Sequence, residues 1–203
     1  MPIRIDVKRK EQQRVVELGG RLLEDGKTWV IPDEITDINP FMEWLPDEEG
    51  YIVQRPYFAV RAKCHCWKCG NETTVVGLGA KNWQSLVYET ADKPRWVKED
   101  YPLLFTEIDQ MDEEIANAMQ TNYPFFRYGY CKEERMKLWG NYCVNCQAKQ
   151  EDDGDFRFGL KNPLSPTSIE QAREIRVIYF GLQFDYYISA GCEMNMLFLE
   201  IIG

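Results

Sequence analysis

Cys66-Trp67-Lys68-Cys69-Gly70 and Cys143-Val144-Asn145-Cys146 are the two stretches of sequence that decide the fold. Each Cys-x-x-Cys pair places two thiolates on one side of a tight turn, and two such turns supply the four soft ligands that tetrahedral Zn²⁺ prefers. Gly70 follows its pair at the position where a left-handed backbone lets amide groups point at the sulfurs. The pattern predicts a structural zinc ion bound by four thiolates, those of Cys66, Cys69, Cys143 and Cys146.

The segment 70–142 separates the two cysteine pairs, and a compact zinc ribbon has a far shorter gap. We therefore expect this segment to fold as an insertion that returns the second pair beside the first. Two alternatives stay open, which are a redox-active Cys-x-x-Cys pair and a set of buried cysteines without metal.

Three further residues are candidates to replace one of the four ligands: Cys64, His65 and Cys131. His65 is the only histidine of the chain. Neighbouring residues of an extended strand point to opposite faces, so His65 would point away from Cys64 and Cys66. We expect His65 to be exposed, or to lie near the ligands without binding the metal, and Cys64, Cys131 and Cys192 to be buried or free thiols.

The sequence around the cysteines reads as strand material, from Val53 to Val60 before the first pair and from Thr73 to Leu78 after it. This framing resembles uncharacterised bacterial zinc-ribbon proteins with a "CWKC" half and an "N-x-C-x-x-C" half separated by a long insertion. The resemblance covers about residues 55–160. It implies zinc and does not imply a reaction.

The composition indicates a globular, acidic protein. The chain has 203 residues, 44% of them hydrophobic, and a formal net charge of −9. No stretch approaches the 18 consecutive apolar residues of a membrane span, and the first residues lack the apolar run of a secretory signal. An odd number of cysteines, seven in all, grouped as Cys-x-x-Cys pairs favours a reducing compartment. We expect a cytoplasmic protein that does not bind a membrane.

The charges are distributed unevenly. Residues 1–31 carry seven basic and five acidic groups, whereas residues 99–114 carry seven acidic groups and no basic one. The N-terminal segment is the better candidate for contact with phosphate, and its candidate nucleic-acid contacts are Lys8, Arg9, Lys10 and Arg14. The alternative for these residues is a solvated helix face. The acidic stretch could meet a basic protein partner.

The N-terminal residues predict a small unit of their own. Residues 3–7 alternate as in a strand, residues 10–18 read as an amphipathic helix that ends at Gly19-Gly20, and residues 21–31 read as a hairpin with an Asp25-Gly26 turn. With a linker at 46–50, the chain divides into a domain at 1–46 and a second domain at 51–203. We predict an α+β fold, in which a β-α-β-hairpin domain precedes an α+β domain that contains the zinc ribbon.

The run from Ile5 through the "DGKTWVIP" segment at 25–32 to Trp44 resembles a small bacterial domain of uncharacterised function, the DUF5710 type. The resemblance covers about the first 46 residues. The DUF5710 type is similar to modules appended to primase-like and plasmid-encoded proteins. The resemblance therefore implies a connection to nucleic acid by association. This chain departs from the pattern at Arg21-Leu22-Leu23, where the usual tryptophan is absent.

Two helices are predicted in the second domain. One covers residues 109–119 with Asp109 as its cap, and the other covers about 168–174 after the capping box Thr167-Ser168-Ile169-Glu170. Between them, residues 123–130 are dense in aromatic side chains. These side chains could stack on nucleic-acid bases beside Arg127, or pack in the core.

A zinc ion with four thiolates has no open position for substrate or water, so such an ion is structural. The leading hypothesis is therefore a non-enzymatic, zinc-stabilised binding protein, accessory to nucleic-acid transactions. One alternative is a protein–protein adaptor that presents an acidic surface to a basic partner. The other is a redox enzyme that works through a Cys-x-x-Cys pair.

Overall fold

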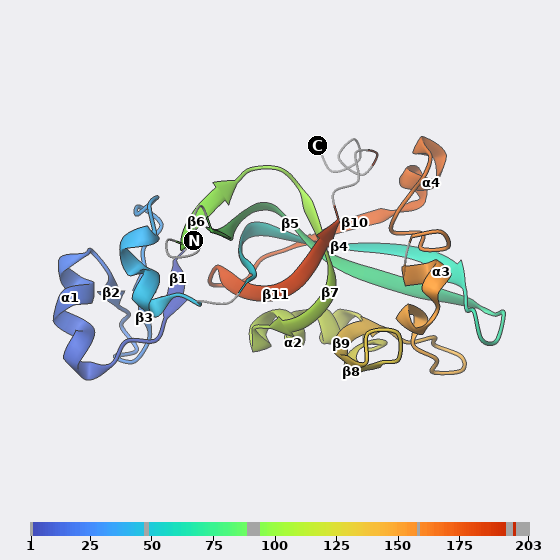
Figure 1. Ribbon diagram of the computed structural model, residues 1–203, viewed down its shortest axis with the longest axis horizontal. Helices are drawn as coiled ribbons and strands as arrows, with labels where there is room; N and C mark the ends of the chain where they lie inside the picture. The colour runs from blue at the N-terminus through green and yellow to red at the C-terminus, as the bar shows by residue number, and fades with distance from the viewer. Residues whose placement is uncertain (1, 47–48, 89–93, 158, 194–196, 198–203) are drawn as a thin grey trace.

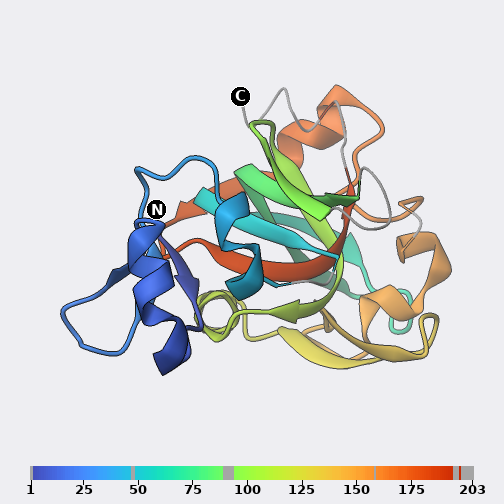
Figure 2. The same cartoon turned by 60° about the vertical axis from the view of Figure 1, so that its left-hand side comes forward.

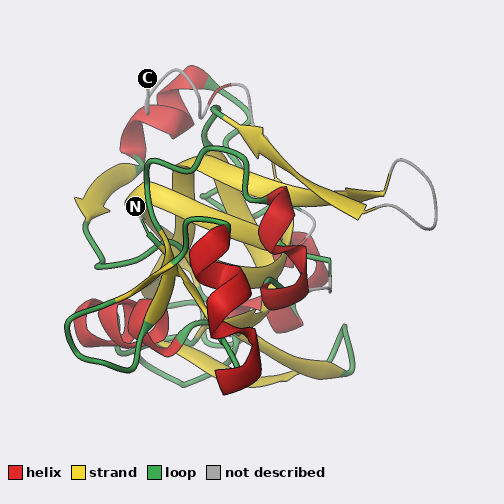
Figure 3. Cartoon of the chain, turned by 90° about the vertical axis from the view of Figure 1, so that its left-hand side faces the viewer, coloured by secondary structure: helices red, strands yellow, loops and turns green. Residues whose placement is uncertain are grey.

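The structure is a computed structural model that describes residues 2–46, 49–88, 94–157, 159–193 and 197. Strands hold 45% of the residues and helices 21%, and the strands form three sheets. The fold is therefore β-rich, and the predicted α+β class with its β-α-β-hairpin domain is wrong. The long segment between the cysteine pairs explains the difference, because most of it forms strands. Figure 3 shows strands running through the molecule, with two helices in front of them in this view and others at the top and lower left.

Four strands pair in a ring at the centre of the molecule. They are β4 (Tyr51–His65), β5 (Glu72–Tyr88), β7 (Leu103–Met111) and β11 (Tyr186–Glu193). β4 pairs with β5, β5 with β7, β7 with β11, and β11 with β4 again, always antiparallel. Figure 2 shows these strands curling around one another. The ring encloses a core that contains Val53, Tyr57, Leu78 and Ile188.

Two strands extend the sheet beyond the ring: β6 (Pro94–Glu99) pairs with β5, and β10 (Arg176–Phe180) pairs with β4. Gly79 of β5 permits close packing on the face of the sheet opposite the enclosed core, where it meets Phe58 of a second hydrophobic cluster. A Cβ atom at this position would lie 2.2 Å from the Phe58 ring and 2.6 Å from the Leu103 carbonyl oxygen. Any side chain here would therefore displace a neighbouring strand.

The β4–β5 hairpin is much longer than the ring and carries the first cysteine pair at its tip. Pairing continues from Tyr51 opposite Ser85 to His65 opposite Glu72. In Figure 1 the hairpin runs to the right-hand end of the molecule. A second hairpin, β8 (Phe126–Cys131) and β9 (Met136–Asn141), lies below the ring in this view and leads directly to the second cysteine pair.

The N-terminal residues form a small antiparallel sheet in the order β1-β3-β2, with β1 (Ile3–Ile5), β2 (Arg21–Leu22) and β3 (Trp29–Ile31). It is accompanied by η1 (Arg9–Glu11), α1 (Gln12–Glu17) and η2 (Asn39–Trp44). One hydrophobic cluster joins this unit to the rest, because it contains Phe41 and Trp44 together with Leu86 and Trp96. The division into domains at 1–46 and 51–203 stays a prediction, and residues 47 and 48 of the expected linker lie outside the described residues.

The helices of the second part are short. They are α2 (Glu113–Asn122), η3 (Gln150–Asp152), α3 (Gly154–Arg157) and α4 (Ile169–Glu174). Ser168 caps α4, since its hydroxyl accepts from the Gln171 amide, so the cap lies one residue after Thr167, the first residue of the predicted capping box. The helix predicted over residues 109–119 is shifted, because strand β7 continues to Met111 and Asp112, not Asp109, caps α2.

Candidate metal centre

The four predicted cysteine ligands meet in one cluster, although segment 70–142 separates the pairs in sequence. The sulfur atoms of Cys66, Cys69, Cys143 and Cys146 all lie within 4.8 Å of one another. Cys66 Sγ is 3.6 Å from Cys146 Sγ, and Cys69 Sγ is 3.8 Å from Cys143 Sγ. Four sulfurs placed tetrahedrally at the usual Zn–S length would be about 3.8 Å apart. The cluster is therefore compatible with a bound metal ion.

The two cysteine turns share one backbone conformation. In the first turn Gly70 N donates to Cys66 O and Cys66 N donates to Asn71 O; in the second, Gln147 N donates to Cys143 O and Cys143 N donates to Ala148 O, each at 2.9 Å. The residue after each pair is left-handed, with φ of 72° at Gly70 and 62° at Gln147. The chain thus builds the same ligand turn twice.

Hydrogen bonds aimed at the sulfurs favour thiolates. Burial opposes ionisation of Cys143, but amide donors from Cys146 and Asn145 outweigh it and lower its pKa to about 6. Burial likewise opposes ionisation of Cys66, where amide donors and the Gln150 side chain, 3.5 Å from the sulfur, lower the pKa. Such donors are typical of metal–thiolate turns.

Negative charge limits how many of the four thiols ionise together. The Ala148 amide lowers the pKa of Cys146, but burial and the thiols of Cys69 and Cys66 outweigh it and raise the pKa to about 11. Like charges a few ångströms apart repel, so the Cys146 thiol keeps its proton at neutral pH. A divalent cation at the centre of the four sulfurs would supply the missing positive charge.

A buried polar network fixes the chain after the second pair, and sequence reasoning missed it. Lys149 is 3% exposed, and its Nζ donates to the carbonyl oxygens of Gly129 and Leu138, each at 2.8 Å. The Glu151 carboxylate accepts from the backbone and side-chain amides of Asn141 at 3.0 Å. Burial raises the pKa of Glu151 and lowers that of Lys149. The sequence signal for this network was the presence of Asn141, Lys149 and Glu151 within five positions of the second cysteine pair.

Asn141 also connects the two hairpins. Its side chain accepts from Val76 N at 2.8 Å and donates to Val76 O at 3.0 Å, as a paired strand residue would. Nearer the cysteines, Trp67 Nε1 donates to Lys149 O at 2.9 Å and Asn145 Nδ2 donates to Glu72 O at 3.0 Å. The cluster is thus held from the β4–β5 tip on one side and from the end of β9 on the other.

The remaining candidate ligands lie outside the four-sulfur cluster. Cys131 is buried and its thiol contacts Glu151 O at 3.6 Å. Burial raises the pKa of Cys64 to about 11, so this thiol is protonated at neutral pH. His65 and Cys192 are exposed. Among the described residues, the group with metal-binding geometry contains the four predicted cysteines alone.

The four basic residues proposed as nucleic-acid contacts are all exposed on η1 and α1 or next to them. Arg14 forms an ion pair with Glu43 and lies over the Trp44 ring at 5.2 Å. Lys10 Nζ is 3.8 Å from the Glu11 carboxylate. Lys8 and Arg9 form no ion pair with a described residue. The positive charge of this segment is therefore partly neutralised by its own acids.

Several acids of the stretch 99–114 are engaged within the chain. Asp112 accepts from Arg4 at 2.7 Å, Glu114 accepts from the Tyr186 hydroxyl, and Glu107 accepts from Arg157 at 2.6 Å. The aromatic stretch 123–130 is divided between two environments. Phe126 is buried and stacks on Trp139, whereas Tyr128 and Tyr130 are about half exposed.

Comparison with family models, with curated proteins and with solved structures gave no match. The resemblances to the DUF5710 type and to bacterial zinc ribbons therefore stay predictions. In the part of the chain that the structure describes, no helix is long and apolar enough to cross a membrane.

Proposed function

We propose that this protein is a non-enzymatic binding protein stabilised by a structural zinc ion, and that it is accessory to nucleic-acid transactions. The observation that carries the proposal is the approach of four cysteine sulfurs to within 4.8 Å of one another. A d¹⁰ ion such as Zn²⁺ suits four thiolates in tetrahedral geometry, and the sulfur–sulfur distances match its size.

The zinc site is proposed to be structural because four thiolates complete its coordination shell. Substrate or water would then find no open position on the metal. With all four thiolates bound to zinc, none would be free for thiol–disulfide exchange, which argues against the redox alternative. Zinc binding would join the tip of the β4–β5 hairpin to the end of β9, so its binding energy would stabilise the fold.

Support for a nucleic-acid ligand comes from the exposed basic residues of the N-terminal unit, Lys8 and Arg9 above all, and from the resemblance of this unit to the DUF5710 type. The adaptor alternative has less support, because Asp112 and Glu107 of the acidic stretch are paired with Arg4 and Arg157. A basic partner would have to displace these contacts.

Metal content and oligonucleotide binding test the two parts of the proposal. Protein purified without added metal should contain one zinc per chain, and Cys143→Ser should lose it while Cys192→Ser, at an exposed position, should retain it. Fluorescence anisotropy with a labelled single-stranded oligonucleotide should show binding that weakens as salt rises. Zinc-free wild-type protein would contradict the metal assignment, and zinc-loaded protein that binds no oligonucleotide would contradict the nucleic-acid assignment.

A further inference from the structure

Two arginines lie directly opposite each other in neighbouring strands. Arg176 is the first residue of β10, and its partner in the register is Arg61 of β4. Like charges at directly opposed positions of an antiparallel pair destabilise the sheet. Neither guanidinium forms an ion pair with a carboxylate among the residues that the structure describes. The chain has a net charge of −9, yet Arg61 and Arg176 lie next to each other without a carboxylate partner among the described residues.

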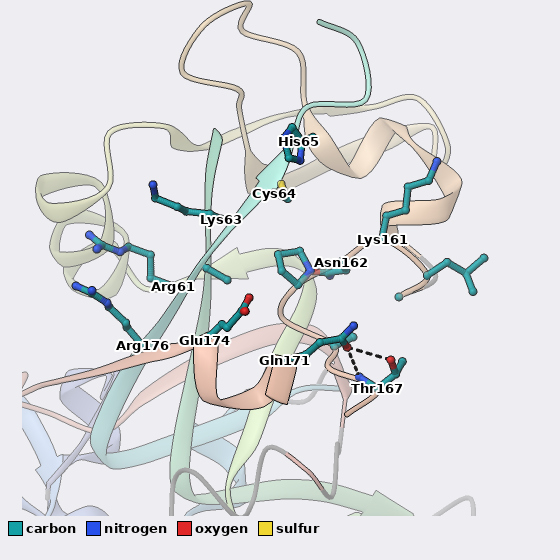
Figure 4. Close-up of a pocket in the computed structure, with 15 residues that line it drawn as sticks. Arg61, Lys63, Cys64, His65, Lys161, Asn162, Thr167, Gln171, Glu174 and Arg176 are labelled. Atoms are coloured by element: carbon teal, nitrogen blue, oxygen red, sulfur yellow. Dashed lines mark hydrogen bonds between the residues drawn. The ribbon is translucent and has the colours of Figure 1, made fainter. Parts of the chain in front are cut away.

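Figure 4 shows the two arginines side by side, with both guanidinium groups extending in the same direction. Lys63, two residues further along β4, extends to the same side. The Glu174 carboxylate points away from both guanidinium groups in this view. All four residues line an open groove of about 640 Å³. The arrangement concentrates positive charge on one side of β4.

The arginine pair stands on a rigid support. β4 is hydrogen-bonded to β5 and β10 at this position, where Arg61 lies opposite both Val76 and Arg176. Ala62, the next residue, is buried in the hydrophobic cluster on the opposite face, together with Val75 and Ile175. The backbone therefore fixes the two arginines at directly opposed positions before any ligand binds.

We propose that Arg61 and Arg176 clamp a phosphate group in the backbone of a single-stranded nucleic acid. A guanidinium is planar and presents paired donors that match phosphate oxygens, and two of them can share one phosphate. The negative charge of the bound phosphate would offset the repulsion between the guanidinium groups of Arg61 and Arg176. This inference rests on the proposed function and gives it a location away from the N-terminal basic residues.

The basic groups along β4 suit a strand of phosphates better than a single small anion. Arg61, Lys63 and His65 occupy alternate positions of one strand, about 7 Å apart at the usual rise of a β-strand. A row of this kind can follow successive phosphates of an extended backbone. Lys63 is paired with the exposed Glu72 at 2.6 Å, so it would exchange this partner for phosphate.

The experiment compares three zinc-loaded proteins by fluorescence anisotropy with a labelled single-stranded oligonucleotide. Arg61→Gln/Arg176→Gln should bind at least tenfold more weakly than wild type, and the slope of log K against log salt should fall by about 0.7 for the one phosphate contact that the two arginines share. Arg173→Gln, on the exposed surface of α4, is the matched control and should bind as wild type does. Thermal unfolding should show the double variant to be no less stable than wild type, because the substitution removes a like-charge pair.

Arg176→Glu provides an independent readout. This substitution places a carboxylate opposite Arg61, so the melting temperature should rise while oligonucleotide binding falls. Equal binding by wild type and the arginine variants would overturn the inference, and loss of binding on reversing Lys8, Arg9 and Lys10 would then place the ligand at the N-terminal unit. Absence of binding by zinc-loaded wild type would overturn both this inference and the nucleic-acid part of the proposed function.

Discussion

The residue after each cysteine pair adopts a conformation that most side chains resist. Gly70 has φ of 72°, and a Cβ atom added there would meet nothing within 4 Å. The cost of a side chain at Gly70 is therefore conformational alone. At the equivalent position the second turn has Gln147, whose side chain accepts from Arg127 at 2.7 Å. The second turn tolerates a strained residue that this contact helps to hold.

We predict that Gly70→Ala lowers the free energy of unfolding of the metal-bound protein by about 1 kcal/mol, the cost of the left-handed conformation for alanine. Gly70→Asn should lose less, because asparagine adopts this conformation more easily. Gly181→Ala is the control, since its Cβ also meets nothing and its φ is not positive. Urea denaturation measures all three, and an unchanged Gly70→Ala protein would show that the turn can relax.

Asp185 is a buried acid directly before β11, at 1% exposure, where its carboxylate accepts from Gln54 at 3.2 Å. Burial raises its pKa to about 6. In the unfolded chain an aspartate titrates near its ordinary value, so between the two values the folded state binds a proton that the unfolded state does not. Stability from this group is present at low pH and is lost as pH rises through about 6.

The expected result is that the unfolding free energy of wild type falls by about 3 kcal/mol relative to that of Asp185→Asn between about pH 4 and pH 7. The comparison between two proteins cancels the pH dependence that zinc binding adds to both. Asp100→Asn, at an exposed position, should track wild type. Parallel pH profiles for wild type and Asp185→Asn would mean that the buried carboxylate is solvated better than its surroundings indicate.

At the scale of elements, the β8–β9 hairpin depends on a lysine that comes after it in sequence. Lys149 follows the second cysteine pair and donates to carbonyl oxygens on both strands of the hairpin, at Gly129 and Leu138. Its pKa is lowered by burial. The ammonium therefore bears a desolvation cost, which these hydrogen bonds and the attraction of the Glu151 carboxylate offset.

Replacing this lysine removes the donors while leaving the carbonyls buried. Lys149→Met should reduce the unfolding free energy by about 3 kcal/mol, in the range found for a broken buried charged hydrogen bond. Lys137→Met, on the exposed part of β9, should change it little. Differential scanning calorimetry at fixed zinc concentration compares the two, and equal melting temperatures would show that water replaces the ammonium.

Elements with local signals were predictable and those decided at long range were not. Asp25-Gly26 signals its hairpin turn, where the Asp25 carboxylate accepts from the amides of Lys27 and Thr28, and Ser168 signals the start of α4. The helix predicted at Asp109 begins later, because residues up to Met111 pair with β11. Residues 109–111 fit a helical periodicity, but they form strand because β7 pairs with a strand that is distant in sequence.

At the scale of the whole molecule, ring closure is the feature that sequence could not reveal. The pairing of β11 with β4 joins Tyr186 to Val53, and nothing in either segment specifies the other. The cysteine cluster was predictable because the chemistry of one ion requires all four sulfurs. The network of Asn141, Lys149 and Glu151 was not, since its polar residues look like an ordinary surface loop until the fold buries them.

Removing the metal should therefore affect one region more than the rest. The ring has its own hydrophobic core, to which β8 contributes Phe126, whereas the second cysteine turn is tied to the β4–β5 tip through the cluster. After chelation, hydrogen–deuterium exchange should increase over residues 126–152 while Val53 to Val60 in β4 stay protected. Exchange that increases equally in both segments would indicate that the metal supports the whole fold.

We propose that four cysteines from two turns distant in sequence bind one zinc ion and leave it no open position. X-ray absorption at the zinc edge of the purified wild-type protein tests this most directly. We expect one zinc per chain with four sulfur neighbours at about 2.3 Å and no lighter ligand. A spectrum with an oxygen or nitrogen neighbour in the first shell, or protein without zinc, would contradict it.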